Sequence, residues 1–512
     1  MVEISQLITT FEEREVEISQ LQHSSYVLYV DLQSICPQDG KEARAEQLTS
    51  LNGIIHEKVT CDNFVHLVKS IKEHEDFSNQ SKEIIRKIEL WNKEIIISNS
   101  FTKKFVQKLE SLKSKTNNLW RIARESLQEE DKKNYLDSLD ELFKLKLEEF
   151  EYIKNKFSYD SVYDYFLDSF EKNMTQEEID NIFSQIKENI IQILNRVESS
   201  ENPIKSSNLE TLKSWKLSPS KQEEILTTVF NHLNLKDSFF THFETTHPFM
   251  ISLGPKEVRV GVAYREDPLF SFSSGIHEAG HALYEHNQNY KDSILGTGTS
   301  MGIHESQSLF WESHISTSKS FLSSFYKEFQ NQSEGQLDNI SFEEFYAYVN
   351  RVSKSLIRIE GDELTYPLHI IIRFEIEKDL FAGNITVYDI EKVWNEKYKK
   401  YLGKEPQNLK EGFMQDVHWS EGMFGYFPTY LLGRIYASQI EKELRKRISN
   451  FEEVVTNYEF DKILHILREG IHKHGRLKTN KEILNDFLGE EGNPATYIEY
   501  LEEKFNSIYH FK

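Results

Sequence analysis

Long runs of helical periodicity, with few residues that would interrupt them, are the strongest constraint on how this chain folds. The 512 residues include only 10 prolines and 21 glycines. Segments such as KEIIRKIELWNKEIIISNSFTKKFVQKLESLKSK (82–115) and LDSLDELFKLKLEEFEYIKNKF (136–157) place apolar residues three and four positions apart between charged ones. This spacing gives an α-helix one apolar stripe that can pack against a core. The sequence therefore predicts a mainly α-helical protein.

One short region has a different character. In FMISLGPKEVRVGVAY (249–264), two runs of β-forming residues flank a Gly-Pro turn. We expect a small β-sheet here, directly before the motif discussed below. Neither an internal repeat nor a low-complexity linker divides the chain, so we expect a single domain over residues 1–512.

The charge balance limits the partners of this protein. Asp and Glu total 83 against 61 Lys and Arg, a formal net charge of −22. This charge repels phosphate backbones and anionic lipid, so neither nucleic acid nor a membrane is an expected partner. The first 20 residues do not have the basic segment and apolar run of a signal peptide. With only two cysteines, Cys36 and Cys61, a disulfide framework is not expected, and we predict a cytoplasmic location.

The segment SSGIHEAGHALYEH (273–286) contains a His-Glu-x-x-His motif. On a helix, His277 and His281 project from one face, so both imidazoles can reach a single ion. Glu278 flanks the same side, where its carboxylate can contact a metal-activated water. Chance would produce at most about 0.1 such matches in a chain of this composition, so a helix with two ordinary histidines is the competing interpretation.

A catalytic zinc site needs a third protein ligand and an open position. Glu285 and His286 lie too far along the same helix from His277 to share its ion. Glu305, in SMGIHESQSLFWESH (300–314), is a candidate on a second expected helix. Glu312 competes with it, either as the ligand or as a partner that orients a zinc-bound histidine.

The sequence resembles the carboxypeptidase Taq type of metallocarboxypeptidases. The resemblance is carried by six blocks in order: HPF (247–249), EVRVG (257–261), HEAGH (277–281), HESQ (304–307), IRIEGD (357–362) and GFMQDVHW (412–419). It is strong over residues 240–440 and weak over the first 200.

This resemblance implies a large single-domain helical zinc-peptidase fold with a long central groove. Residues 1–200 would form a helical wall of the groove, and 240–440 its catalytic core. It implies His277, His281 and Glu305 as metal ligands and Glu278 as the catalytic base. It also implies a homodimer that acts on peptides as a broad carboxypeptidase.

One block departs from the family pattern Asp-x-Arg-x-Thr. Glu257 stands in place of the Asp and Gly261 in place of the Thr, while Arg259 is kept. The departure bears on how Arg259 is supported and on substrate preference.

The chemistry of amide hydrolysis indicates further candidates. A zinc ion would activate water at neutral pH, and Glu278 would take its proton and return it to the leaving amine. His418 and Tyr426 are candidate donors to the oxyanion of the tetrahedral intermediate, with packing in an aromatic cluster as the alternative for both. We expect their aromatic neighbours, Tyr430 among them, to serve packing.

A carboxypeptidase must also bind the free carboxylate of its substrate, and arginine does this with two parallel hydrogen bonds. Arg358 is the first candidate because it belongs to the IRIEGD block, and Arg259 and Arg373 are weaker ones. Each of the three has a structural alternative, a buried ion pair with a nearby acid.

Three functions are compatible with these observations. The first is a zinc-dependent carboxypeptidase. The second is an oligoendopeptidase of the same helical group, and the third is an inactive helical scaffold. Zn²⁺ is the expected ion, although two imidazoles and a carboxylate also suit Co²⁺ or Mn²⁺.

Overall fold

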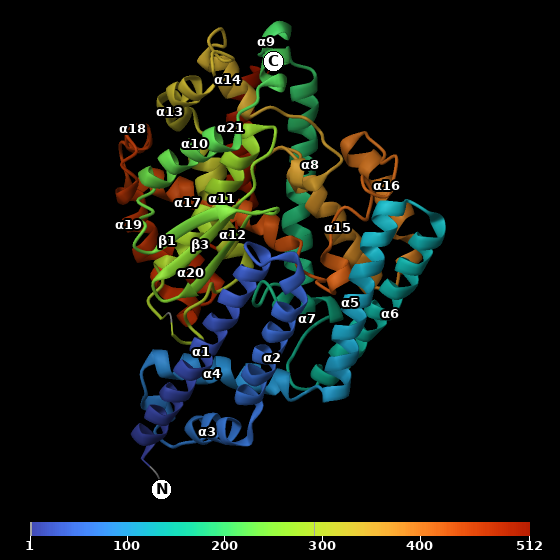
Figure 1. Ribbon diagram of the computed structural model, residues 1–512, viewed down its shortest axis with the longest axis vertical. Coiled ribbons are helices and arrows are strands. Elements are labelled where there is room, and N and C mark those ends of the chain that lie inside the picture. Colours follow the sequence, from blue (N-terminus) through green and yellow to red (C-terminus); the bar gives the residue numbers. More distant parts are fainter. Residues whose placement is uncertain (1–2, 291, 512) are drawn as a thin grey trace.

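The computed structural model describes residues 3–290 and 292–511, and it is mainly helical, as the periodicity predicts (Figure 1). The first half of the chain forms helices α1 (Ile4–Gln33), α2 (Lys41–Thr60), α3 (Asp62–Lys72), α4 (Lys82–Ser98), α5 (Lys103–Ser126), α6 (Glu129–Ile153), α7 (Val162–Asp168), α8 (Gln176–Glu198), α9 (Ser206–Ser214) and α10 (Pro219–His232). The second half forms α11 (Pro268–His286), α12 (Met301–Leu309), the π-helical η3 (Phe310–Ser316), α13 (Lys319–Gln332), α14 (Phe342–Val349), α15 (Tyr366–Phe381), α16 (Ile390–Leu402), α17 (Pro428–Arg447), α18 (Phe451–Thr456), α19 (Phe460–Gly470), α20 (Asn480–Leu488) and α21 (Pro494–Tyr509).

Side chains and prolines set where many of these helices begin. Thr175 caps α8 in a reciprocal capping box with Glu178, which satisfies two backbone N–H groups that the first turn leaves free. Pro268 and Pro428 stand at the starts of α11 and α17, where a missing N–H costs nothing. The positions at which α11 and α17 begin, beside the candidate site, are therefore favoured by the local sequence.

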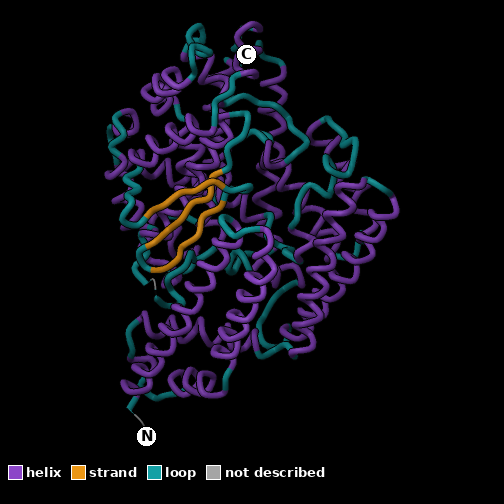
Figure 2. The backbone as a smooth tube through the Cα atoms, in the orientation of Figure 1, coloured by secondary structure: helices purple, strands orange, loops and turns teal. Residues whose placement is uncertain are grey.

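The expected hairpin is present, and a third strand joins it. Strands β2 (Phe249–Gly254) and β3 (Glu257–Val262) pair antiparallel, with Phe249 opposite Gly261. Strand β1 (Phe240–Glu244), which the sequence pattern does not indicate, adds to β3 in parallel and completes the order β1-β3-β2. The sheet lies over α11, so it forms one side of the site region (Figure 2).

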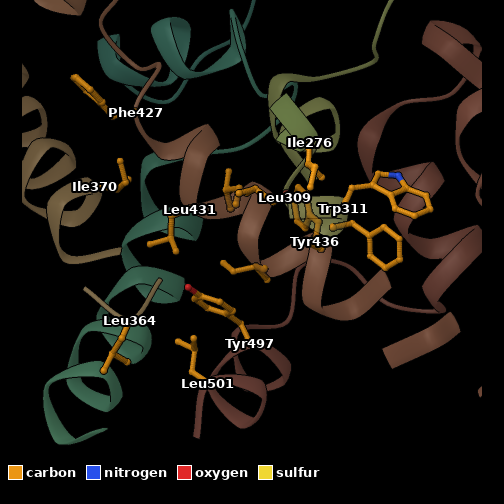
Figure 3. Packing of buried hydrophobic residues seen from close by; sticks show 14 of the residues in the cluster. Ile276, Leu309, Trp311, Leu364, Ile370, Phe427, Leu431, Tyr436, Tyr497 and Leu501 are labelled. Carbon is orange, nitrogen blue, oxygen red and sulfur yellow. The ribbon is translucent and has the colours of Figure 1, made fainter. Parts of the chain in front are cut away.

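Most of the buried apolar side chains form one large core around α11, α12 and α17. In Figure 3, side chains from α11, α12, α17 and α21 converge, including Ile276, Leu309, Tyr436 and Tyr497. Two glycines allow the close approach of these helices. A Cβ at Gly280 would lie 2.6 Å from the backbone of Ser308, and one at Gly433 would lie 2.6 Å from Cγ of Glu305.

The N-terminal helices α1, α3 and α4 form a second, smaller core at the lower end of the molecule in Figure 1. Phe64 stacks on Phe11 and meets Trp91 edge to face in it. Buried Glu15 links this core to the rest of the chain, because its Oε1 accepts hydrogen bonds from Nε1 of Trp91 and from the backbone N–H of Ile294.

Candidate active site

Helix α11 presents the two motif histidines and Glu278 toward the interior of the molecule. Asp267 caps the helix by accepting from the N–H of Leu269. The rings of His277 and His281 lie 4.8 Å apart between centroids, as expected for residues four apart on one helical face. Apolar residues on the opposite face, among them Phe272 and Leu283, are buried in the core and fix the rotation of the helix.

Glu305 of α12 meets both histidines. Its Oε2 lies 3.8 Å from Nε2 of His277 and 3.6 Å from Nε2 of His281. The three ligand atoms lie within 4.8 Å of one another, and the arrangement is a candidate metal site. Ligand atoms about 2 Å from a tetrahedral ion are themselves about 3.3–3.6 Å apart, so the two distances from Glu305 are close to those that such an ion requires.

Glu312, the competing carboxylate, occupies a different position. Its Oε2 lies 2.8 Å from Nδ1 of His277, the ring nitrogen that points away from Glu305, and its Oε1 accepts from the hydroxyl of Ser273. It sits on the π-helical turn η3, a distortion that often occurs at functional sites. Glu312 therefore orients the imidazole of His277.

The charges of the site favour a cation. Although burial acts to lower it, Glu305 and Glu312 raise the pKa of His277 to about 10. Burial, together with His304 and His277, lowers the pKa of His281 well below its usual value, so that this imidazole is neutral. Burial raises the pKa of Glu278 to about 7. Several carboxylates thus surround two imidazoles, and a divalent ion would balance this excess of negative charge.

His304 and Glu285 contact each other beside His281. Nε2 of His304 lies 3.0 Å from Oε1 of Glu285, and the His304 ring packs on that of His281 at 4.4 Å. The sequence excluded Glu285 as a ligand of the same ion, and its place in the structure is that of a partner for His304. Only the packing of α12 against α11 reveals this role.

A groove of about 1600 Å³ opens in front of the site. His277, Glu278 and Glu305 line it, together with Tyr366, Tyr430 and Arg434, which sequence reasoning did not select for substrate contact. The sequence does contain a local indication that Tyr430 and Arg434 act together. They are four residues apart on a helix that begins at Pro428, so they share one face.

Arg358 and Arg373 share one carboxylate. Nε and Nη2 of Arg358 donate to Oδ1 of Asp416 at 2.9 and 2.8 Å, and Nε of Arg373 donates to Oδ2 at 2.7 Å. Arg358 lines the groove and donates its Nη1 to the hydroxyl of Tyr366 at 2.8 Å. Arg373 is 0% exposed.

Arg259 lies on β3 and pairs with Glu257, whose Oε1 is 2.7 Å from its Nε. Gly261 faces Thr245, and a Cβ at Gly261 would lie 2.8 Å from the Thr245 hydroxyl oxygen. The longer acid thus still reaches Arg259, and the space beside Gly261 is already taken by Thr245.

His418 and Tyr426 belong to an aromatic group that includes Tyr430. Nε2 of His418 lies 3.3 Å from the Tyr430 hydroxyl, and burial lowers the pKa of His418 to about 3, so the imidazole is neutral. The ring of Tyr426 lies 5.3 Å from that of Tyr430. Of these three, Tyr430 is the one that lines the groove within the described part of the chain.

Comparisons with known proteins agree with this geometry. Residues 10–505 match the family described as Carboxypeptidase Taq (M32) metallopeptidase. Carboxypeptidase 1 of Bacillus subtilis is 35% identical over 497 residues, 96% of each chain, and thermostable carboxypeptidase 1 of Thermus thermophilus is 30% identical over 94% of each.

Solved structures show the same architecture. An M32 carboxypeptidase from Deinococcus radiodurans has a TM-score of 0.93 at 26% identity, covering 99% of this chain and all of that one. Metallocarboxypeptidase 1 of Trypanosoma cruzi has a TM-score of 0.89 at 29% identity, covering 98% of this chain and all of that one. The chain therefore belongs to the carboxypeptidase Taq (M32) family and is a metallocarboxypeptidase.

Proposed function

We propose that this protein releases amino acids from the C-termini of peptides with one divalent metal ion held by His277, His281 and Glu305. The observation that carries the proposal is the convergence of two imidazole nitrogens and one carboxylate oxygen beside Glu278, at the wall of a peptide-sized groove. Zn²⁺ suits these three donors best, and Co²⁺ and Mn²⁺ are alternatives.

The bound metal would supply Lewis acidity, which polarises the scissile carbonyl and makes water a nucleophile near neutral pH. Glu278 would accept the proton of the attacking water on its carboxylate and deliver it to the leaving amine. Its position on the groove, without a ligand role of its own, supports this assignment. Glu312 would hold the Nδ1 proton of His277 and so present Nε2 to the ion.

Tyr426 and His418 are the proposed supports of the oxyanion. Tyr426 lies within electrostatic range of Glu305. The neutral imidazole of His418 contacts the hydroxyl of Tyr430 at the groove wall and would fix its direction. The two residues would thus stabilise the developing charge, Tyr426 by donation and His418 through Tyr430.

Arg358 is the proposed contact with the substrate side of the groove, through the Tyr366 hydroxyl that it binds. Arg373 would act through Asp416, which both arginines share. Arg259, held by Glu257 on the sheet, would contribute to peptide binding at the edge of the site.

The proposal extends to the whole chain. Residues 1–512 would form one domain, with residues 1–200 as a helical wall and 240–440 as the catalytic core, in a homodimer. No described helix is both long and apolar enough to cross a membrane. The described cysteines, Cys36 and Cys61, are free thiols, which supports a reducing, cytoplasmic setting.

A direct experiment compares a peptide that ends in a free acid with the same peptide as its C-terminal amide. We expect the Zn²⁺-loaded protein to release the last residue of the free acid and to leave the amide intact. Equal cleavage of both, at internal bonds, would instead support the oligoendopeptidase. No cleavage of either would support the inactive scaffold.

The Glu278→Gln variant tests the mechanism. We expect at least about a 1000-fold loss of kcat because the proton acceptor is missing. Metal content, measured by atomic emission, should stay near one ion per chain, since Glu278 is not a proposed ligand. Turnover near the wild-type rate would rule out Glu278 as the base.

A further inference from the structure

Arg434 is a buried arginine on the groove wall with no carboxylate of its own. It lies on α17, one turn after Tyr430, and is 9% exposed. Its guanidinium lies over the ring of Tyr366 at 4.4 Å. Its Nε has no hydrogen-bond partner among the residues that the structure describes. A buried donor without an acceptor costs free energy and calls for an explanation, such as a ligand.

The other arginines near the reaction centre already have a carboxylate within ion-pair distance. Arg358 and Arg373 both pair with Asp416, and Arg259 pairs with Glu257. In contrast, no described carboxylate lies within ion-pair distance of Arg434, although Glu363 and Glu312 act on its charge from farther away and Tyr497 lies beside it.

Two more arginines, Arg265 and Arg351, line the groove, and both are less buried than Arg434. Arg265 stacks on Phe270 at 3.7 Å. Arg351 donates to the carbonyl of Tyr348 and stacks on its ring at 4.0 Å. Arg434 is within electrostatic range of both Glu305 and Glu312.

Arg434 also lies close to the reaction centre, because the preceding residue, Gly433, packs against Glu305. A Cβ at Gly433 would touch the side chain of Glu305, so this turn of α17 lies directly against the proposed metal ligand. A ligand bound to Arg434 therefore lies near the ion, as the last residue of a peptide must when its amide bond is the one cleaved.

We propose that Arg434 binds the terminal carboxylate of the substrate and so makes the enzyme select free-acid C-termini. This inference rests on the proposed function. The planar guanidinium can donate two parallel hydrogen bonds to a carboxylate. Tyr366 supports the same group, because its hydroxyl accepts from Arg358 and keeps its own proton for donation.

The first test measures hydrolysis of an N-blocked dipeptide by Arg434→Met. We expect kcat/KM to fall about 100-fold, because two charge-assisted hydrogen bonds are lost. Arg434→Lys should recover part of the loss, since it keeps the charge but not the planar fork. Arg351→Met, which removes an arginine from the same groove, should change kcat/KM less than threefold. An Arg434→Met enzyme with wild-type kcat/KM would overturn the inference.

The second test measures binding without turnover, in the Zn²⁺-loaded Glu278→Gln background. Calorimetry should show that the free-acid peptide binds more tightly than its amide. Adding Arg434→Met or Arg434→Lys should reduce that preference at least tenfold and leave amide binding unchanged. If both peptides lose affinity equally, Arg434 has only a structural role and the inference fails.

These outcomes separate the inference from the proposed function. A wild-type protein that hydrolyses no peptide contradicts the proposed function itself. A wild-type carboxypeptidase whose free-acid preference survives in both Arg434 variants contradicts only the role of Arg434. Circular dichroism and the urea midpoint establish that each variant is folded, and Arg434→Lys carries the test if the Met variant is not.

Discussion

The carboxylate of Asp416 accepts hydrogen bonds from two arginines, Arg358 and Arg373. Although burial acts to raise it, Arg358 and Arg373 hold the pKa of Asp416 well below its usual range. Arg373 is fully buried and Arg358 is largely buried at the groove wall, so removal of the carboxylate would leave both charges poorly compensated. The carboxylate therefore contributes to stability through charge as well as through hydrogen bonds.

We expect Asp416→Asn to lower the free energy of unfolding by about 3–5 kcal/mol at neutral pH, measured by urea denaturation. Because its folded-state pKa is depressed, the carboxylate contributes fully above the unfolded pKa and loses its contribution as pH falls. The difference between wild type and variant should therefore shrink below about pH 4. A difference that grows with acidification would contradict this account. Glu210→Gln, in an exposed pair with Lys213, should show no measurable change.

The side chain of Thr245 occupies the space that a side chain at Gly261 would need. A Cβ at this position would lie 2.8 and 2.9 Å from side-chain atoms of Thr245 and 3.0 Å from the ring of Phe249. The Thr of the family pattern would therefore not fit without displacing a neighbour on the sheet. The sequence shows the departure, but only the parallel pairing of β1 with β3 shows what fills the space.

At the scale of elements, the contact between α12 and α17 positions Glu305. The side chain of Glu305 packs against Gly433, where any Cβ would lie 2.6 Å from its Cγ. The absence of a side chain at Gly433 thus allows α17 to lie against the proposed ligand and fixes the direction of its carboxylate.

Gly433→Ala should therefore weaken metal binding. We expect the affinity for Zn²⁺ to fall at least about tenfold, as when a partner of a metal ligand is altered, measured by competition with a chromogenic chelator. Gly470→Ala is a matched control, because its Cβ would clash with the ring of Phe487 in a contact between α19 and α20. The control should lose stability and keep its affinity. Equal affinities in Gly433→Ala and wild type would show that Glu305 is positioned in another way.

At the scale of the whole molecule, the described apolar side chains form three hydrophobic cores of different size. The largest surrounds the candidate site, a second joins α1, α3 and α4, and the smallest lies between α5 and α6. Helix α2 has no buried side chain, whereas most residues of α17 are buried. Opening α2 would therefore expose little apolar surface, and opening α17 would disrupt the large core.

Hydrogen exchange followed by mass spectrometry should reveal this difference. We expect backbone amides of α2 to exchange at least about 100-fold faster than those of α12 and α17, since protection follows the free energy of local opening. Metal binding should slow exchange in α11 and α12 more than in α2. Uniform protection across these helices would contradict an effect of this difference in burial.

The sequence alone was sufficient for the features that depend on spacing within one element. Helical periodicity predicted the fold class, two runs of β-forming residues around a Gly-Pro turn predicted a small sheet where β2 and β3 lie, and the i, i+4 spacing placed His277 and His281 on one face. Strand β1 was missed because five residues with a parallel partner carry little local signal.

The tertiary structure decided the features that depend on contacts between elements. The spacing of Glu305 and Glu312 left their roles open, and the packing of α12 and η3 against α11 places one at both Nε2 atoms and the other at Nδ1 of His277. Likewise, an arginine in a sequence shows its charge but not its counter-ion. Only the folded chain pairs Arg358 with Asp416 and leaves Arg434 facing the groove, because ion pairing depends on distances that local sequence does not set.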